Sequence, residues 1–180
     1  MEILGLDMIK KEPDTINITG LDKIRQVFHN DLPGMSPFAI EFLRLVGRLR
    51  ELDRDLEEFG AEVHQYRFNP VIPLSDVRKF EERCQITLPQ GYVDFLTQVG
   101  NGGAGPAYGF CSIEETESRH SRTGRMIILN YGCGRFCTLR SDGKIGYMDM
   151  EHDSEPPFEE TAFEEFALKW AKDTIKKYEN

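Results

Sequence analysis

The hydrophobic pattern changes period part-way along the chain, and this change limits the possible folds more than any other feature. Up to about residue 100, apolar residues recur every three or four positions, as on one face of a helix. After residue 124, the segments RMIILNYG, RFCTLRS and KIGYMDM read as three short strands, and the Asp142–Gly143 pair indicates a hairpin turn. Helices, then a meander and then a closing helix predict an α+β fold, with a mixed or antiparallel sheet flanked by helices.

The closing helix is predicted from the segment TAFEEFALKWAKDTIKKY. Thr161 and Glu164 match a capping box, and acidic residues at the start with lysines at the end suit the helix dipole. Its apolar face is formed by residues at helical spacing: Phe163, Phe166, Ala167, Trp170 and Ala171.

Two shorter helices are predicted before the sheet. Ser75 is expected to cap the first, on which Val77, Phe80 and Cys84 align. Proline opens the second directly after Leu88, and glycine at position 100 ends it. The inner face of the second helix contains Tyr92, Phe95, Leu96 and Val99.

A heptad stripe follows the helix-start signal Ser36–Pro37. Its members alternate in spacing between three and four: Phe42, Leu45, Leu49, Leu52, Leu56, Phe59, Val63 and Tyr66. Such a stripe serves either as the seam of a dimeric coiled coil or as a face buried within its own domain. The stripe is short and contains Gly47 and Gly60, which favours packing within the chain. We therefore expect a monomer, or a weak homodimer through residues 42–66. A short helix is also predicted within residues 19–28.

Composition restricts the classes of function. The 180 residues suffice for one domain with a modest extension, and 39% hydrophobic with 29% charged residues is typical of a soluble globular protein. The N-terminus lacks the pattern of a secretory signal and no apolar run is long enough for a membrane helix, so we expect a cytoplasmic protein with four free thiols. A net charge of -9 argues against nucleic-acid binding.

The stretch GNGGAGPAYG invites comparison with phosphate-binding loops. Such loops follow a strand and open a helix with a lysine, whereas here a helix comes before the loop and a strand after it. The chain also contains no lysine between Lys79 and Lys144. We therefore interpret the glycines as structural, because glycine permits positive φ and close backbone approach.

The sequence contains no complete set of ligands for a metal or cofactor. Cys133 and Cys137 would share one face of a strand, but no second pair completes a zinc site, and the histidines at positions 29, 64, 120 and 152 are scattered. Asp149, Glu151, Asp153 and Glu160 match four ligand positions of a calcium loop, but Ser154 replaces the required glycine. No cofactor is expected.

An acidic segment is the most informative surface feature. No Lys or Arg lies between Lys144 and Lys169, whereas the same window holds eight acidic residues. This segment is either a solvated loop or a contact surface for a basic protein, drawn in by electrostatic steering. The candidate partner-binding residues are Asp149, Glu151, Asp153, Glu155, Glu159 and Glu160.

A set of ordered motifs resembles the hallmark of the SUKH superfamily, whose founding members are yeast Smi/Knr-type cell-wall regulators. Phe80–Glu81 end one helix, a Leu-Pro pair opens the next, and an Asn-Gly-Gly run follows it. Apart from Phe80–Glu81, the hallmark residues are Leu88, Pro89, Tyr92, Phe95, Leu96, Asn101, Gly102 and Gly103. The resemblance covers residues 70–175. It implies a SUKH-like domain over residues 67–180 and an N-terminal helical extension with a linker helix over residues 1–66.

The resemblance also implies a function. Many bacterial SUKH proteins are considered non-enzymatic immunity proteins that bind and neutralise a cognate toxin, often a nuclease. We therefore expect a cognate protein toxin, basic in charge, as the partner. Two alternatives stay open: an intracellular scaffold or regulatory module like the eukaryotic relatives, and an enzyme that uses Cys133 or Cys137. The resemblance transfers no residue-level site, because such interfaces differ between members.

Overall fold

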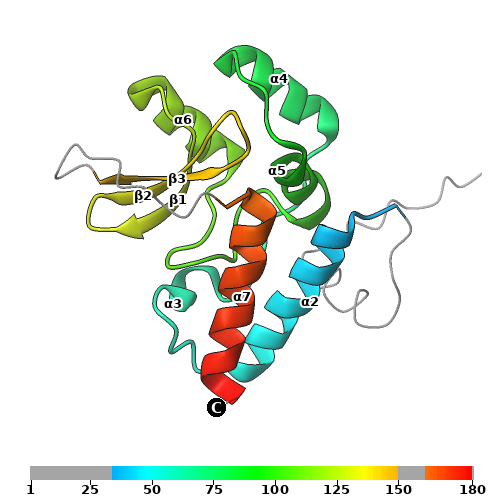
Figure 1. Cartoon of the computed structure of the whole chain (residues 1–180), viewed down its shortest axis with the longest axis vertical. Coiled ribbons are helices and arrows are strands. Elements are labelled where there is room, and N and C mark those ends of the chain that lie inside the picture. The colour runs from blue at the N-terminus through cyan, green and yellow to red at the C-terminus, as the bar shows by residue number, and fades with distance from the viewer. Residues whose placement is uncertain (1–33, 150–160, 180) are drawn as a thin grey trace, which may run out of the picture.

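The computed structural model describes residues 34–149 and 161–179; the helix predicted within residues 19–28 lies outside them. The described chain forms helices, a short three-stranded sheet and a closing helix (Figure 1). The elements before the sheet are α2 (Pro37–Leu52), α3 (Ala61–His64), α4 (Leu74–Cys84), α5 (Gln90–Asp94), which runs on into a π-helical turn η1 (Phe95–Val99), and α6 (Ile113–Thr123). The rest are β1 (Ile127–Gly132), β2 (Arg135–Leu139), β3 (Ile145–Asp149) and α7 (Phe163–Glu179).

The sheet is an antiparallel meander in the order β1-β2-β3. Cys137 of β2 lies opposite Leu129 of β1 and Tyr147 of β3. The turn between β2 and β3 is closed by hydrogen bonds from Arg140 N to the Lys144 carbonyl and from Gly143 N to the Arg140 carbonyl. The α+β class, the three strands and the hairpin turn predicted from the sequence are confirmed.

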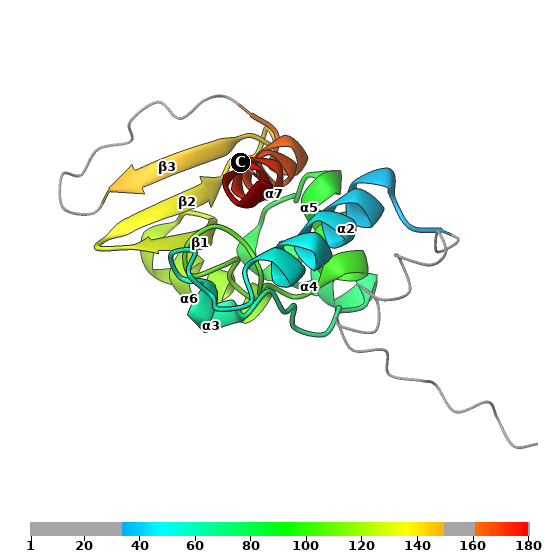
Figure 2. The same ribbon diagram turned by 90° about the horizontal axis from the view of Figure 1, so that it is seen from below.

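One hydrophobic core joins α2, α7 and the segments between them. The two helices run side by side (Figures 1 and 2). Phe42 of α2 is fully buried at their junction, with its ring centroid about 6 Å from five other aromatic rings. These rings belong to Phe38, Phe68, Phe95, Phe110 and Trp170. The predicted domain boundary between residues 66 and 67 stays a prediction. Residues on both sides of this boundary contribute to the same core, because α2 packs against α7.

The heptad stripe over residues 42–66 does not lie on one helix. α2 ends at Leu52, and the Asp53 carboxylate accepts hydrogen bonds from Glu57 N at 2.7 Å, Glu58 N at 3.2 Å and the Tyr66 hydroxyl at 2.7 Å. These bonds turn the chain away from the helix axis. Phe42, Leu49 and Tyr66 are buried within the chain, whereas Phe59 and Val63 lie on the surface, so the stripe forms no single face. A weak homodimer through residues 42–66 stays a prediction.

The helices around the sheet follow the predicted pattern with two differences. Tyr92, Phe95, Leu96 and Val99 are all buried, as predicted. α4, however, begins at Leu74 and has Pro73 as its N-cap, so Ser75 lies inside the helix and does not cap it.

The second difference is α6, which the hydrophobic pattern did not predict. Only Ile113 and Thr116 of this helix are buried, so it carries no apolar stripe. The sequence feature that marks the start of α6 is a capping box. In it the Ser112 side chain accepts a hydrogen bond from Glu115 N, and the Glu115 side chain accepts one from Ser112 N. The helix ends at Gly124, which adopts a positive φ of 69°.

Candidate functional site

The glycine-rich stretch after η1 extends the sheet rather than forming a ligand cradle. Isolated β-bridges pair Phe68 with Gly103, Gly103 with Phe110, and Phe110 with Leu129 of β1. Gly102 has φ of +80°, and a Cβ at this position would lie 2.7 Å from the Phe110 carbonyl oxygen. The backbones therefore approach too closely for any side chain, which confirms the structural interpretation of these glycines.

Asn101 ties this stretch to the start of α6. Its Oδ1 accepts a hydrogen bond from Ile113 N at 2.7 Å, and its Nδ2 donates to Glu114 Oε2 at 3.0 Å. Its backbone carbonyl also accepts a bond from Asn69 Nδ2 at 2.9 Å. Asn101 is 8% exposed, so these bonds satisfy a buried amide. The side chain has a structural role.

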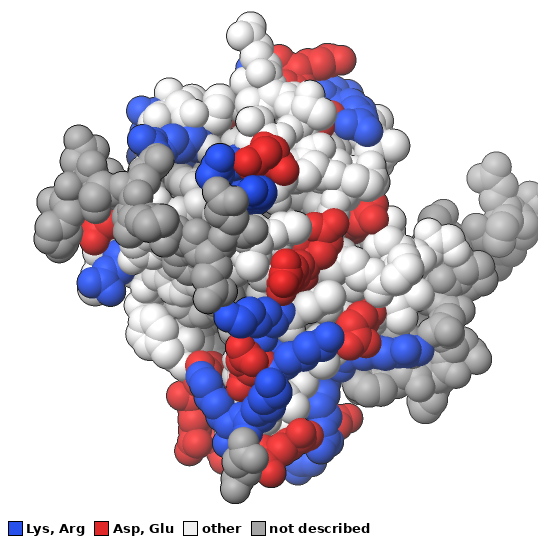
Figure 3. All heavy atoms as spheres, viewed as in Figure 1, with Lys and Arg blue, Asp and Glu red and all other residues white. Residues whose placement is uncertain are grey.

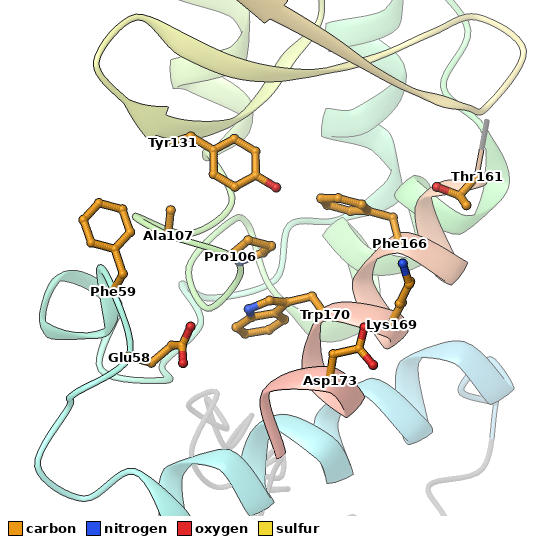
Figure 4. Close-up of a pocket in the computed structure, with 10 residues that line it drawn as sticks. All are labelled: Glu58, Phe59, Pro106, Ala107, Tyr131, Thr161, Phe166, Lys169, Trp170 and Asp173. Carbon is orange, nitrogen blue, oxygen red and sulfur yellow. The ribbon is translucent and has the colours of Figure 1, made fainter. Parts of the chain in front are cut away.

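An aromatic pocket of about 340 Å³ opens between α7, β1, the turn before α3 and the glycine-rich stretch (Figure 4). α7 and the residue two places before it supply Thr161, Phe166, Lys169, Trp170 and Asp173, and the other segments supply Glu58, Phe59, Pro106, Ala107 and Tyr131. Its walls are mostly apolar, with a few charged groups, which is the usual composition of a binding pocket.

Exposed hydrophobic side chains gather beside the aromatic pocket. Four large hydrophobic residues of the described chain are exposed: Phe59, Val63, Leu74 and Tyr108. Three of the four lie on the segment at α3 or on the glycine-rich stretch, and the Phe59 and Tyr108 rings stand 5.4 Å apart. Exposed apolar groups concentrated around a pocket indicate an interaction surface.

Local backbone packing holds these rings in place. Gly60 adopts φ of +82°, and a Cβ there would overlap the Ala107 carbonyl, so the two segments touch through their backbones. His64 lies at the same junction, and its Nδ1 accepts a hydrogen bond from Tyr66 N at 3.0 Å. Burial lowers the pKa of His64, although hydrogen bonds with the backbone of Gly105 and Ala107 oppose the shift. The lowered pKa favours the neutral form of the imidazole.

Charged groups of both signs border the aromatic pocket. Lys177 Nζ lies 2.7 and 2.9 Å from the two Glu58 carboxylate oxygens, and Lys176 Nζ lies 3.5 Å from Asp173 Oδ1. Figure 3 shows cationic and anionic side chains interleaved over the lower part of the molecule, where α7 and α2 end. An apolar centre with a charged border is the arrangement found in protein–protein contact sites.

A scan of protein families matches residues 72–169 to the SMI1 / KNR4 family (SUKH-1), which is more than half of the chain. The chain belongs to the SMI1 / KNR4 family. The match runs from the residues before α4 into α7 and includes the whole hallmark. No curated protein matches the chain. SUKH domains are generally non-enzymatic, and the family suggests a protein as the partner.

In this SUKH protein the hallmark residues maintain the fold. Leu88, Tyr92, Phe95 and Leu96 are buried, and Pro89 is the N-cap of α5. The aromatic pocket uses none of them. Its residues come from positions as distant as 58, 107, 131 and 170, so no local motif signals it. In the sequence, Phe59 matches the heptad stripe, and this spacing gives no indication that its side chain is exposed beside the aromatic pocket.

The predicted acidic segment is described only at its edge. Asp149 ends β3 opposite Arg135 of β2, whereas Glu151, Asp153, Glu155, Glu159 and Glu160 lie outside the described residues. One described flank of the segment lines the aromatic pocket, and the other reaches it only through the contact of Tyr147 with Tyr131. Thr161 lines it, and Tyr147, two residues before Asp149, places its ring 6.4 Å from the ring of the lining residue Tyr131.

The thiols offer little nucleophilic chemistry. Cys133 is exposed in the β1–β2 turn with φ of +47°, and Cys137 is buried in β2, so the expectation that both share one strand face is wrong. Burial raises the pKa of Cys137 to about 12 and that of Cys111 to about 11. Both thiols therefore remain protonated at neutral pH.

Two features are absent from the described part of the chain. Over residues 34–149 and 161–179, no three His, Cys, Asp or Glu side chains gather closely enough to hold a metal ion. None of the helices in these ranges combines the length and hydropathy of a bilayer-spanning segment.

Proposed function

We propose that this SUKH protein is a non-enzymatic immunity protein that binds a cognate basic toxin in the cytoplasm and blocks it by direct contact. The acidic segment carries the proposal. It holds eight acidic residues and no Lys or Arg between Lys144 and Lys169, and Thr161 on its C-terminal side lines the aromatic pocket. Negative charge beside an apolar pocket suits a basic protein surface with apolar anchors.

The two parts have different roles in this proposal. The acidic charge attracts the toxin at a distance and raises the association rate, an effect that salt weakens. The aromatic pocket and the neighbouring exposed rings provide the desolvated contacts that slow dissociation. Buried thiols at Cys111 and Cys137 agree with a reducing compartment such as the cytoplasm.

The proposal predicts that a neighbouring gene encodes a toxin domain, and the test uses that domain. Its affinity for the full chain is measured by titration calorimetry at two salt concentrations. We expect the double variant Glu151→Lys with Asp153→Lys to bind at least about tenfold more weakly at low salt. The control Asp55→Lys with Glu82→Lys makes the same change in net charge at exposed positions elsewhere and should bind like the wild type.

Equal binding by both double variants would show that the acidic segment is not the contact surface. The scaffold alternative predicts a different result: purification of the chain from its own cells would return several host proteins, and the toxin domain would not bind at all.

A further inference from the structure

We infer that the aromatic pocket accepts an arginine side chain of the bound toxin. This inference rests on the proposed function, since it names the group that a basic partner inserts. The aromatic pocket is defined entirely by described residues, and its volume of about 340 Å³ is sufficient for one long side chain with its neighbouring backbone.

The rings of the aromatic pocket suit a guanidinium group. Trp170, Phe166 and Tyr131 surround one space, with Pro106 as its floor (Figure 4). Trp170 also contacts the core through Phe42, with 6.2 Å between ring centroids, so its indole is fixed in orientation. Guanidinium is planar and weakly hydrated and stacks on aromatic faces, while the aliphatic part of an arginine packs on apolar walls.

The carboxylates of the aromatic pocket have remaining capacity for a cation. Glu58 uses both oxygens for Lys177, but a carboxylate has about four acceptor positions, and this side chain is 23% exposed. Asp173 is paired only loosely, at 3.5 Å, with Lys176, and both side chains are more than half exposed. Two carboxylates therefore border the rings; Lys169 is the lining cation, and Lys176 and Lys177 are paired with the carboxylates from outside the lining.

The chain contains a single tryptophan, Trp170, and it lies in the aromatic pocket. Its indole N–H gives one NMR cross-peak, and its fluorescence reports occupation of the aromatic pocket without any label. The full chain is titrated with the blocked peptide acetyl-Gly-Arg-Gly-amide. A matched peptide has citrulline in place of arginine, which keeps the shape and removes the charge. Two more peptides have leucine or phenylalanine.

We expect the arginine peptide to shift the Trp170 signals saturably and to bind about fivefold more tightly than the citrulline peptide. Tighter binding by the leucine or phenylalanine peptide would overturn the inference in favour of an apolar anchor. No saturable shift with the arginine peptide would also overturn it.

Paired variants test the carboxylates. Glu58→Gln with Asp173→Asn should remove most of the preference for arginine over citrulline. The control Asp55→Asn with Glu82→Gln makes the same change in charge at exposed positions outside the aromatic pocket. It should keep the preference for arginine over citrulline. An unchanged preference in the first variant would contradict the inference. Toxin affinity measured separately on the wild type distinguishes this failure from failure of the proposed function.

Discussion

Glu81 accepts a hydrogen bond from the backbone N–H of Leu88, with 2.7 Å between Oε1 and N. Glu81 is 8% exposed, and its other carboxylate oxygen is paired with Arg78. The bond spans the turn between α4 and α5, so a polar member of the family hallmark holds together two helices that carry the hydrophobic members.

Replacing Glu81 with alanine should therefore destabilise the fold. The Leu88 N–H would be left without an acceptor, and we expect the free energy of unfolding to fall by about 1–3 kcal/mol in urea titrations. Glu81→Gln should lose less stability, because the amide oxygen can still accept the hydrogen bond from Leu88 N–H. The exposed neighbour provides the control: Glu82→Ala should change stability by less than about 0.5 kcal/mol. Equal losses at both positions would count against the role of this bond.

A second prediction compares the hallmark glycine Gly102 with Gly124, which ends α6. Gly102 and Gly124 both have positive φ, but only a Cβ at Gly102 meets backbone atoms, at 2.7 Å, whereas a Cβ at Gly124 meets nothing within 4 Å. Gly124→Ala should cost only the left-handed backbone conformation, about 1–2 kcal/mol. Gly102→Ala must also move the chain at Phe110 to Ser112, and we expect a clearly larger loss, measured by thermal unfolding. Similar melting temperatures for the two variants would contradict the steric explanation.

The contrast between local and distant interactions explains which features the sequence revealed. The strands, the helical segment that contains α5 and η1, and α7 follow from the spacing of apolar residues, and these predictions were confirmed; the π-helical form of η1 was not predicted. The end of α2 depends on Asp53 meeting the Tyr66 hydroxyl thirteen residues later, which no local pattern shows. α6 was missed because its surface is polar, although Ser112 and Glu115 carried the signal. The aromatic pocket exists only once α7 and the glycine-rich stretch are folded together.

The buried imidazole of His64 should make stability depend on pH. Burial lowers its pKa below the ordinary value of 6.5, so the unfolded chain binds a proton more readily than the folded one. The contribution is fully present above about pH 6.5 and is lost as pH falls toward the folded pKa. We expect the melting temperature of the wild type to fall more steeply between pH 7.5 and pH 5.5 than that of His64→Gln. Parallel curves would show that His64 does not titrate this way.

Thiol labelling should distinguish the cysteines. Cys133 is exposed, whereas Cys111 and Cys137 are buried and have raised pKa values. Iodoacetamide at neutral pH should modify Cys133 in the folded protein and reach Cys111 and Cys137 only after denaturation, as followed by peptide mass mapping. Rapid labelling of Cys137 in the native state would instead support a reactive thiol.

The most direct test of the proposed function is rescue of growth. Cells expressing the cognate toxin domain, which the proposal predicts beside this gene, are given equal amounts of the wild type, of Glu151→Lys with Asp153→Lys, or of the control Asp55→Lys with Glu82→Lys. Surviving colonies are counted. We predict rescue by the wild type and the control, and loss of rescue with the acidic-segment variant. Failure of the wild type to rescue, or full rescue by the acidic-segment variant, would contradict the account.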